Sequence, residues 1–372
     1  MSTIPATYQE SRQRFREYLP VIRKKWSKAS LGKHALANKK ELTIDWLRAN
    51  ALKRKERLLV ITTGLHGIEG YIGSAVLQLY IEEFLPRIDP DTTGILLIHS
   101  LNPWGMSNWK RINPNNVDLN RNFISGDFRS SQLENRDYPG LIPFLYPNRP
   151  VGNLSAEKTR FVVGLLKTII RLGAGRLREA ALMGQYDHPS GIYFGGQSLQ
   201  EETRTIMKLY QDSFKGYNRI VHLDLHSGYG PRDQMTVVTS PCDDREAQVI
   251  KHAYHLERVA GANPDEFYSM NGDMNDWEYE LVREKYPRAS IFAANLEFGT
   301  YGNSFLAEAR SLRITILKNQ KNQFGGSPAT GAWVDREYCK LYLPEEQVWF
   351  EKVQIDARQA FESILKFEGI TK

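Results

Sequence analysis

The chain alternates between short, mainly apolar runs and polar turns. The runs cover residues 58–63, 94–99, 220–225 and 291–296, and glycine, serine or both follow each run within a few positions. Apolar runs bounded by turn signals are typical of strands that are buried on both faces. We expect these four segments to form the centre of a sheet.

Helical periodicity fills much of the chain between these runs. Apolar residues recur at helical spacing in residues 70–84, between the first two predicted strands, and again in residues 155–169. Strand, helix and strand in this order predict a right-handed parallel unit, whose ligands bind beyond the carboxyl ends of the strands. Further segments with helical or strand patterns are 199–214, 235–239, 246–259 and 344–367.

The remaining segments have weaker patterns. Residues 8–26 are typical of an amphipathic helix. Residues 42–47 alternate like a strand, which we expect to form an edge hairpin with the strand that begins at residue 58. Residues 125–150 are rich in proline, glycine and charge and are interpreted as an irregular insertion. Ser155 is the predicted N-cap of the helix that follows it.

The charge distribution bears on which partners the protein binds. The 372 residues carry a formal net charge of +6, with lysine and arginine concentrated at 23–25 and 39–57. We interpret these stretches as solvated helix and hairpin faces, because they lack the interleaved aromatic residues and the motifs of nucleic-acid-binding modules. We therefore expect no nucleic-acid partner. An anionic substrate or partner fits the charge equally well.

The sequence predicts a cytoplasmic protein without membrane association. Its two cysteines, Cys242 and Cys339, are too few for the disulfide framework of a secreted chain. Residues 1–18 lack the apolar core of a secretory signal, and no apolar stretch is long enough to cross a bilayer. These patterns do not predict the oligomeric state.

Candidate metal ligands stand directly after two of the predicted strands. His66 and Glu69 follow the first strand, and His226 ends the third. A catalytic zinc site uses three such protein ligands and leaves one position open. A His-x-x-Glu pair alone also fits a solvated turn, but the matching histidine at another strand end favours a metal site. His222, inside the strand, is interpreted as a packed histidine.

Polar residues also follow the other two predicted strands. The loop at 109–123 holds two arginines, an aspartate and several amides, although turn chemistry alone also accounts for such a run. Glu297 ends the fourth strand, where a buried carboxylate costs free energy unless it is paired or functional. An ion pair with a nearby arginine and a catalytic role are both open for Glu297 at this point.

Taken together in chain order, these segments resemble the zinc carboxypeptidases of the M14 type, and most closely the DUF2817 branch of bacterial proteins. The resemblance runs from about residue 58 to residue 302. It is carried by His66-Gly-Ile-Glu69, Val117-Asp-Leu-Asn-Arg-Asn-Phe123, Leu225-His-Ser227, Asn295-Leu-Glu-Phe-Gly299, and the spacing of Tyr268, Gly272, Asp276, Trp277 and Tyr279.

The resemblance implies an α/β fold with a mixed, mostly parallel central sheet and helices on both faces. We expect a single zinc carboxypeptidase-like domain spanning residues 1–372. Residues 1–57 would add an N-terminal helix and an edge hairpin. The two histidine ligands are farther apart than expected in the secreted digestive members, which places an insertion at about residues 125–216.

The resemblance also implies a cofactor and catalytic roles. His66, Glu69 and His226 match the ligands of one zinc ion per chain. Glu297 matches the general base, which takes a proton from water and passes it to the leaving amine. Arg111 is implied to stabilise the developing oxyanion as a preorganised cation.

The implied substrate is a peptide or amino-acid conjugate with a free carboxylate. Asn120 and Arg121 match the family's carboxylate clamp, in which the arginine binds in bidentate fashion. Asp118 is implied to orient the first zinc histidine, and Tyr268 to close over the substrate. Asn275 stands where the digestive enzymes set their side-chain preference; it is neither apolar nor charged, so no known preference transfers.

The implied activity is that of a zinc metallocarboxypeptidase, which releases a C-terminal residue from a peptide or a small amide conjugate. An aspartoacylase-like deacylase of N-acyl amino acids shares the implied site and is the first alternative. The helical pattern after Phe350, where such deacylases carry a β domain, favours the peptidase. A non-catalytic binding protein on the same scaffold is the second alternative, but the presence of Glu297 beside all three ligand candidates argues against it.

Overall fold

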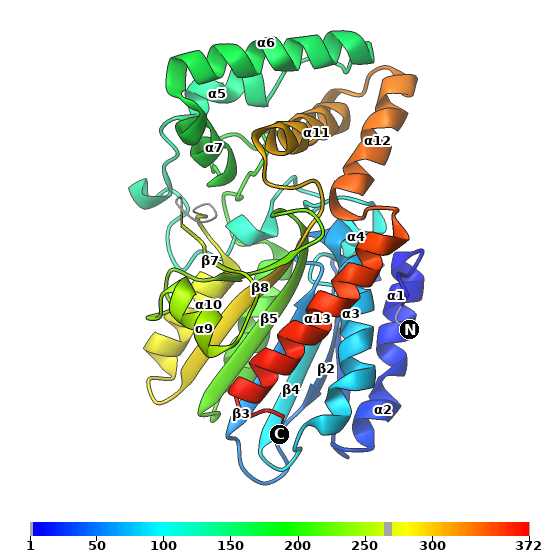
Figure 1. Cartoon of the computed structure of the whole chain (residues 1–372), viewed down its shortest axis with the longest axis vertical. Coiled ribbons are helices and arrows are strands. Elements are labelled where there is room, and N and C mark those ends of the chain that lie inside the picture. The colour runs from blue at the N-terminus through cyan, green and yellow to red at the C-terminus, as the bar shows by residue number, and fades with distance from the viewer. Residues whose placement is uncertain (1–2, 264–269, 372) are drawn as a thin grey trace.

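The computed structural model describes residues 3–263 and 270–371. Within this part of the chain, one eight-stranded sheet has the order β1-β2-β4-β3-β5-β8-β6-β7 (Figure 1). Its strands are β1 (Ser30–Leu36), β2 (Lys39–Ala49), β3 (Arg57–Thr63), β4 (Thr93–His99), β5 (Arg219–Gly228), β6 (Met235–Thr239), β7 (Val259–Gly261) and β8 (Ser290–Gly299).

The centre of the sheet is parallel. β3 pairs in parallel with β4 and β5, and β5 pairs in parallel with β8. Antiparallel pairing joins β2 to β4 and β6 to β8 on the two flanks. The four apolar runs form these four parallel strands. The prediction of a mixed, mostly parallel sheet is confirmed.

Helices cover both faces of the sheet, and others stand beyond its strand ends. The helices of the described residues are α1 (Tyr8–Glu17), α2 (Leu19–Arg23), α3 (Gly70–Glu83), α4 (Pro103–Ser107), α5 (Tyr138–Leu145), α6 (Leu154–Leu172), α7 (Ala174–Leu182), α8 (Glu201–Phe214), α9 (Ala247–Ala253), α10 (Met274–Lys285), α11 (Phe305–Phe324), α12 (Pro328–Tyr342) and α13 (Gln347–Phe367). Short 3-10 turns are η1 (Gly67–Glu69), η2 (Leu85–Arg87), η3 (Leu119–Arg121) and η4 (Ser131–Leu133). Among the described residues, no helix is both long and apolar enough to cross a membrane.

The apolar runs are continuous because both faces of each central strand are buried. Leu59 and Ile61 of β3 belong to a core shared with α3 and α13. Leu58 and Val60, which point to the other face, belong to a core shared with α8 and α10. A strand covered in this way gains from an apolar residue at every position, not at alternate positions.

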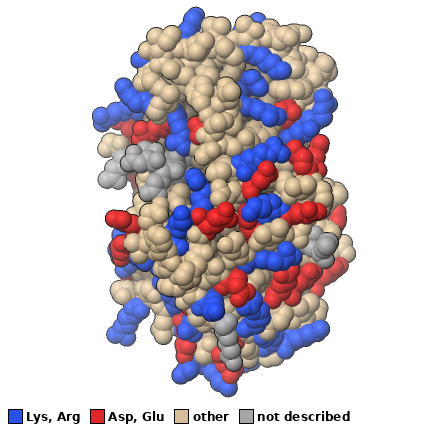
Figure 2. Space-filling view, in the orientation of Figure 1, with Lys and Arg blue, Asp and Glu red and all other residues tan. Residues whose placement is uncertain are grey.

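A second layer of helices stands over the carboxyl ends of the central strands (Figure 1). It includes α5, α6 and α7, from the segment between β4 and β5, together with α11; these helices share an apolar core. On the face drawn in Figure 2, acidic and basic residues are interspersed over the lower part of the molecule, and uncharged residues cover most of this helical layer. Helices therefore cover the carboxyl ends of the central strands.

The edge hairpin consists of β1 and β2, so the predicted pairing of residues 42–47 with the strand at 58 is wrong. β3 has parallel partners on both sides, and no edge of it is left for β2. The sequence did not predict β1, because this strand is mostly exposed and contains Gly32 and Lys33 in place of an apolar run.

Two helix boundaries also differ from the prediction. The helix expected at 8–26 is two helices, and Pro20 lies in the first turn of the second, where its missing N–H costs no hydrogen bond. The N-cap of α6 is Asn153, whose side chain accepts a hydrogen bond from the Ser155 N–H at 3.0 Å. Ser155 itself lies within the helix.

Candidate metal centre

Close backbone contacts shape the turn that follows β3. Gly64 has a φ of +70°, and a Cβ on it would lie 2.2 Å from a neighbouring serine hydroxyl. A Cβ on Gly67 would lie 2.2 Å from the backbone of α4. Backbone amides of η1 also donate hydrogen bonds to carbonyls of residues 110 and 111. These contacts hold His66 and Glu69 against the loop at 109–123.

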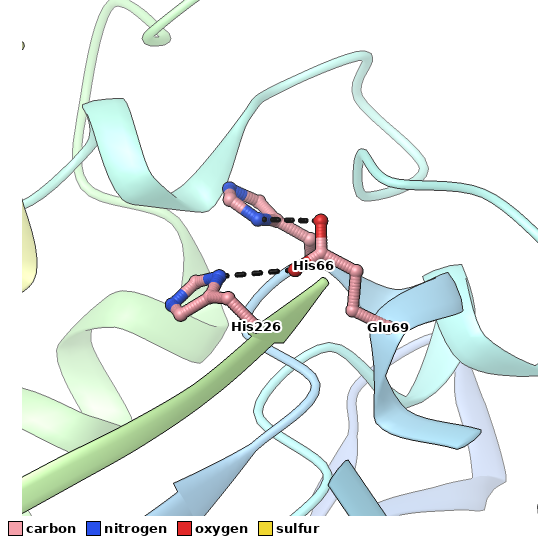
Figure 3. Close-up of side chains that lie close together, drawn as sticks. All are labelled: His66, Glu69 and His226. Carbon is pink, nitrogen blue, oxygen red and sulfur yellow. Dashed lines mark hydrogen bonds and ion pairs between the residues drawn. The ribbon is translucent and has the colours of Figure 1, made fainter. Parts of the chain in front are cut away.

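His66, Glu69 and His226 come together at the carboxyl ends of β3 and β5 (Figure 3). His66 Nδ1 lies 3.0 Å from Glu69 Oε1, and His226 Nδ1 lies 3.0 Å from Glu69 Oε2. One ligand atom from each residue lies within 4.8 Å of the other two. The three side chains are at most 4% exposed. The structure therefore places the three ligand candidates around one point.

A second carboxylate contacts the other nitrogen of each imidazole. His66 Nε2 lies 3.1 Å from Asp118 Oδ1. His226 Nε2 lies 2.5 Å from Asp224 Oδ2. Such carboxylates orient a ligating histidine and raise its basicity. Both rings thus direct Nδ1 toward Glu69.

His222 takes part in a buried network behind this centre. Its Nδ1 lies 2.9 Å from Glu278 Oε2 on α10, and its Nε2 lies 2.7 Å from the Thr62 hydroxyl. That hydroxyl donates to Asp224 Oδ1 at 2.6 Å. The network connects α10 to the carboxylate that holds His226.

The chemistry of the donor set fits zinc. Two imidazoles and one carboxylate are a ligand set of catalytic zinc sites. Among the described residues, the buried Nδ1 of His66 makes no hydrogen bond, although Glu69 is near. Burial raises the pKa of Glu69, but His66 and His226 lower it to well below its ordinary value. Burial lowers the pKa of His226, but Asp224 and Glu69 raise it well above its ordinary value. The cluster therefore attracts positive charge.

Glu297 lies beside this cluster because β5 and β8 pair His226 with Glu297 in their register. Glu297 Oε1 accepts a hydrogen bond from the Tyr229 N–H at 2.9 Å. Burial and then the negative charge of Glu69 raise the pKa of Glu297 to about 7. Glu297, His66 and His226 line one cavity of about 60 Å³. A carboxylate whose pKa is near neutrality is suited to proton transfer.

Arg111, predicted to stabilise the oxyanion, and Asn120, predicted to bind substrate, line the same cavity. Arg111 Nη1 lies 3.2 Å from Glu69 Oε1, and its Nε donates to Asp118 Oδ2 at 3.0 Å. The Asn120 side chain donates to Asp273 Oδ2 at 2.8 Å and accepts from a backbone N–H at the start of α10. Arg111 thus places positive charge in the wall, and Asn120 ties the 109–123 loop to α10.

The other predicted substrate residues lie away from the cavity wall or cannot be placed. Arg121 is fully buried and donates to the carbonyls of Leu182 and Asn120; it does not line the cavity. Asn275 lies behind the wall and donates to Asn295 Oδ1 at 2.8 Å. Tyr268 lies outside the described residues.

The sequence did not single out three residues of the centre. Asp224 stands two positions before His226, so both share one strand face, and this spacing was a usable signal. Tyr229 follows the same strand, and its backbone holds Glu297. Tyr193 lines the cavity, and its ring lies 5.7 Å from the Arg111 guanidinium carbon and 5.8 Å from that of Arg121. No local pattern marks this tyrosine, which comes from the insertion.

Comparison with known proteins gives one family and several distant structural likenesses. The family model described as "Protein of unknown function (DUF2817)" matches residues 5–356. No curated protein matches the sequence.

Among solved structures, bovine thrombin-activatable fibrinolysis inhibitor in complex with tick carboxypeptidase inhibitor is 13% identical, with 95% of this chain and 97% of that chain covered and a TM-score of 0.48. Carboxypeptidase A from Helicoverpa armigera is 14% identical, with 85% of this chain and 72% of that chain covered and a TM-score of 0.45. The murein-tripeptide amidase of Escherichia coli O157 is 17% identical, with 80% of this chain and 93% of that chain covered and a TM-score of 0.36. All three TM-scores are below 0.5, so the geometry of the centre itself must carry any functional assignment.

Proposed function

The chain belongs to the DUF2817 family, and we propose that it is a zinc-dependent metallocarboxypeptidase that hydrolyses a C-terminal peptide or amide bond next to a free carboxylate. One observation carries the proposal: His66, Glu69 and His226 converge on one point, and Glu297 lies in the same buried cavity. A binding protein has no use for a carboxylate with a pKa of about 7 beside such a cluster.

The proposed roles follow from the contacts of each side chain. Zinc bound by His66, Glu69 and His226 supplies a Lewis acid that polarises the scissile carbonyl and acidifies water. Glu297 takes a proton from the attacking water and delivers it to the leaving amine. The Tyr229 N–H holds Glu297 in place for both transfers.

Substrate binding is assigned to the arginines and amide around Tyr193. Arg111, in the cavity wall, stabilises negative charge on the carbonyl oxygen as the tetrahedral species forms. Its ion pairs with Asp118 and Glu69 hold the guanidinium in that position beforehand. Asn120 and Arg121 bind the terminal carboxylate; the Arg121 guanidinium carbon lies 5.8 Å from the ring of Tyr193, which lines the cavity.

The test is hydrolysis of a substrate panel by zinc-loaded protein. The panel contains peptides with free C-termini, the same peptides amidated, and N-acyl amino acids. We expect cleavage of the free-acid peptides, loss of activity with a chelator, and no turnover by Glu297→Gln protein. Cleavage confined to N-acyl amino acids would replace the peptidase by a deacylase. Absence of metal-dependent cleavage on the whole panel would refute the proposal.

A further inference from the structure

The insertion and α11 line an apolar cavity of about 230 Å³ next to the candidate metal centre. Its walls come from α6, α7 and α11, together with Tyr193 and the turn at 228–229. Its apolar lining includes Leu165, Ile169, Leu177, Ala181, Ala309 and Leu312. A cavity of this kind takes up apolar groups, because water inside it finds few polar partners.

This cavity adjoins the metal centre. Leu182, Tyr193, Tyr229 and Ser311 line both the apolar cavity and the smaller cavity that holds Glu297. A substrate bound at the metal centre therefore has one of its groups beside the apolar cavity.

Arg121 indicates which group of the substrate this is. The Leu182 carbonyl accepts hydrogen bonds from Arg121 Nε and Nη2, at 3.2 and 2.7 Å. The ring of Tyr193 lies 5.8 Å from the same guanidinium. Leu182 and Tyr193 are both walls of the apolar cavity. A residue whose carboxylate binds at Arg121 thus has its own side chain next to this cavity.

The charged groups in the cavity wall are paired with each other. Arg178 Nε lies 3.4 Å from Glu308 Oε1, and the Tyr229 hydroxyl donates to the same oxygen at 2.9 Å. The Arg178 guanidinium also lies over the Tyr229 ring, 5.6 Å from its centre. A charged ligand would lose its hydration here without gaining an opposite charge. The wall therefore selects an uncharged group.

We propose that this cavity binds the side chain of the substrate's C-terminal residue, and that this side chain is aromatic or branched aliphatic. The inference rests on the proposed carboxypeptidase function and names its substrate class. A cavity of about 150 Å³ is large enough for benzene, so 230 Å³ accommodates a phenyl or isobutyl group. The insertion thus has a function, which is to form the binding site for this side chain. Asn275 does not form that site, because it lies behind the other cavity.

The experiment compares two ligands and three variants. N-acetyl-phenylalanine and N-acetylglycine are titrated calorimetrically into the full chain, and kcat/KM is measured for peptides that end in phenylalanine, leucine, lysine or glycine. Ala309→Phe fills the cavity from α11, and Gly175→Phe fills it from the rim, where an added Cβ meets no atom within 4 Å. Leu306→Phe is the matched control, because Leu306 is on the same helix as Ala309 but is 77% exposed and outside the cavity.

We expect wild type and Leu306→Phe to favour phenylalanine over glycine by roughly ten- to a hundredfold, the gain from burying one large apolar side chain. Both cavity-filling variants should lose this preference, so that their kcat/KM on the phenylalanine peptide falls to the level of the glycine peptide. Equal binding of the two N-acetyl amino acids and equal cleavage of the four peptides by active wild type would overturn the cavity assignment and leave the carboxypeptidase proposal intact. A binding preference for N-acetyl-phenylalanine without hydrolysis of any peptide would refute the carboxypeptidase proposal and leave the cavity assignment intact. A wild-type oligomer that Ala309→Phe dissociates would show that a second copy of the chain, not a substrate, occupies the cavity.

Discussion

His226 and Glu297 are register partners on adjacent parallel strands, so their side chains leave the same face of the sheet at the same level. The candidate ligand and the candidate base are therefore positioned by the most rigid part of the fold. Glu69 comes from a different element, the turn after β3, and contacts both histidines. The centre thus depends on β3 and β5 being direct neighbours.

The metal prediction separates ligands from a nearby histidine. His66→Ala or His226→Ala should remove the zinc, about one ion per chain, because each takes away one of three ligands. His222→Gln should keep the zinc, because His222 contacts Glu278 and Thr62 and lies outside the cluster. Elemental analysis of the purified variants gives the answer. Zinc retained in both alanine variants, or lost only in His222→Gln, would contradict the ligand assignment.

Glu297→Gln should keep zinc and lose turnover. The amide preserves the shape of the side chain but cannot accept a proton, and such groups contribute about 10²–10⁴-fold to the rate. In the wild type, kcat/KM should fall as the pH drops through the Glu297 pKa of about 7, because only the ionised carboxylate accepts a proton. Bound zinc favours the ionised form, so this acidic limb should lie at or below pH 7. A loss smaller than tenfold in the variant would remove Glu297 from this role.

Much of the candidate centre could be predicted from the sequence because its candidate ligands stand at strand ends. A buried parallel strand is apolar at every position, so a histidine or glutamate where the run stops is conspicuous, as for His66 and Glu297. Asp224 was overlooked because it lies inside the run, where its only signal is the two-residue spacing to His226.

The helical layer over the centre was much harder to predict. α11 buries Lys318, Asn319 and Gln320 alongside its apolar residues, because it packs between other helices and offers polar contacts to loops. Its apolar positions therefore do not follow a simple helical stripe. The cavity wall formed by Tyr193 depends on packing between segments that are distant in the sequence, and no local pattern encodes such contacts.

Asp224, whose carboxylate contacts His226 Nε2, should control metal affinity without being a ligand. Asp224→Asn keeps the size of the side chain but weakens the contact that fixes the His226 ring at 2.5 Å. Loss of such a partner typically costs 10–100-fold in metal affinity, about the range we expect here. Competition with a chromogenic chelator measures it. Unchanged affinity would show that β5 alone positions His226.

Asp276 should make stability depend on pH. Burial and the neighbouring Asp273 raise its pKa to about 8 from the ordinary 3.8, so the folded chain holds this proton more tightly than the unfolded chain. The stability that this proton provides is complete below pH 3.8 and is lost as the pH rises to about 8. Asp276→Asn, which stays uncharged, should match wild type near pH 4 and exceed it at pH 8.5 by at least about 1.4 kcal/mol, the value of one pKa unit.

Denaturant unfolding at both pH values measures this difference, and Asp187→Asn, at an exposed aspartate, is the matched control. A variant whose stability relative to wild type is the same at both pH values would show that Asp276 is ionised in the folded chain.

The last prediction distinguishes the two arginines beside Tyr193. Arg121→Lys removes the planar fork that matches a carboxylate, so kcat/KM on free-acid peptides should fall roughly ten- to a hundredfold, the value of a charge-assisted hydrogen bond. Amidated peptides lack that carboxylate, and their slow cleavage should not change. Arg111→Lys, in the cavity wall, should slow both substrates by the same factor, because the carbonyl oxygen is common to them. Steady-state kinetics on matched acid and amide peptides compares the two variants. If Arg111→Lys instead abolishes the preference for the acid while Arg121→Lys retains it, then Arg111 binds the carboxylate, and the contacts of buried Arg121 with Leu182 and Tyr193 serve only to shape the cavity.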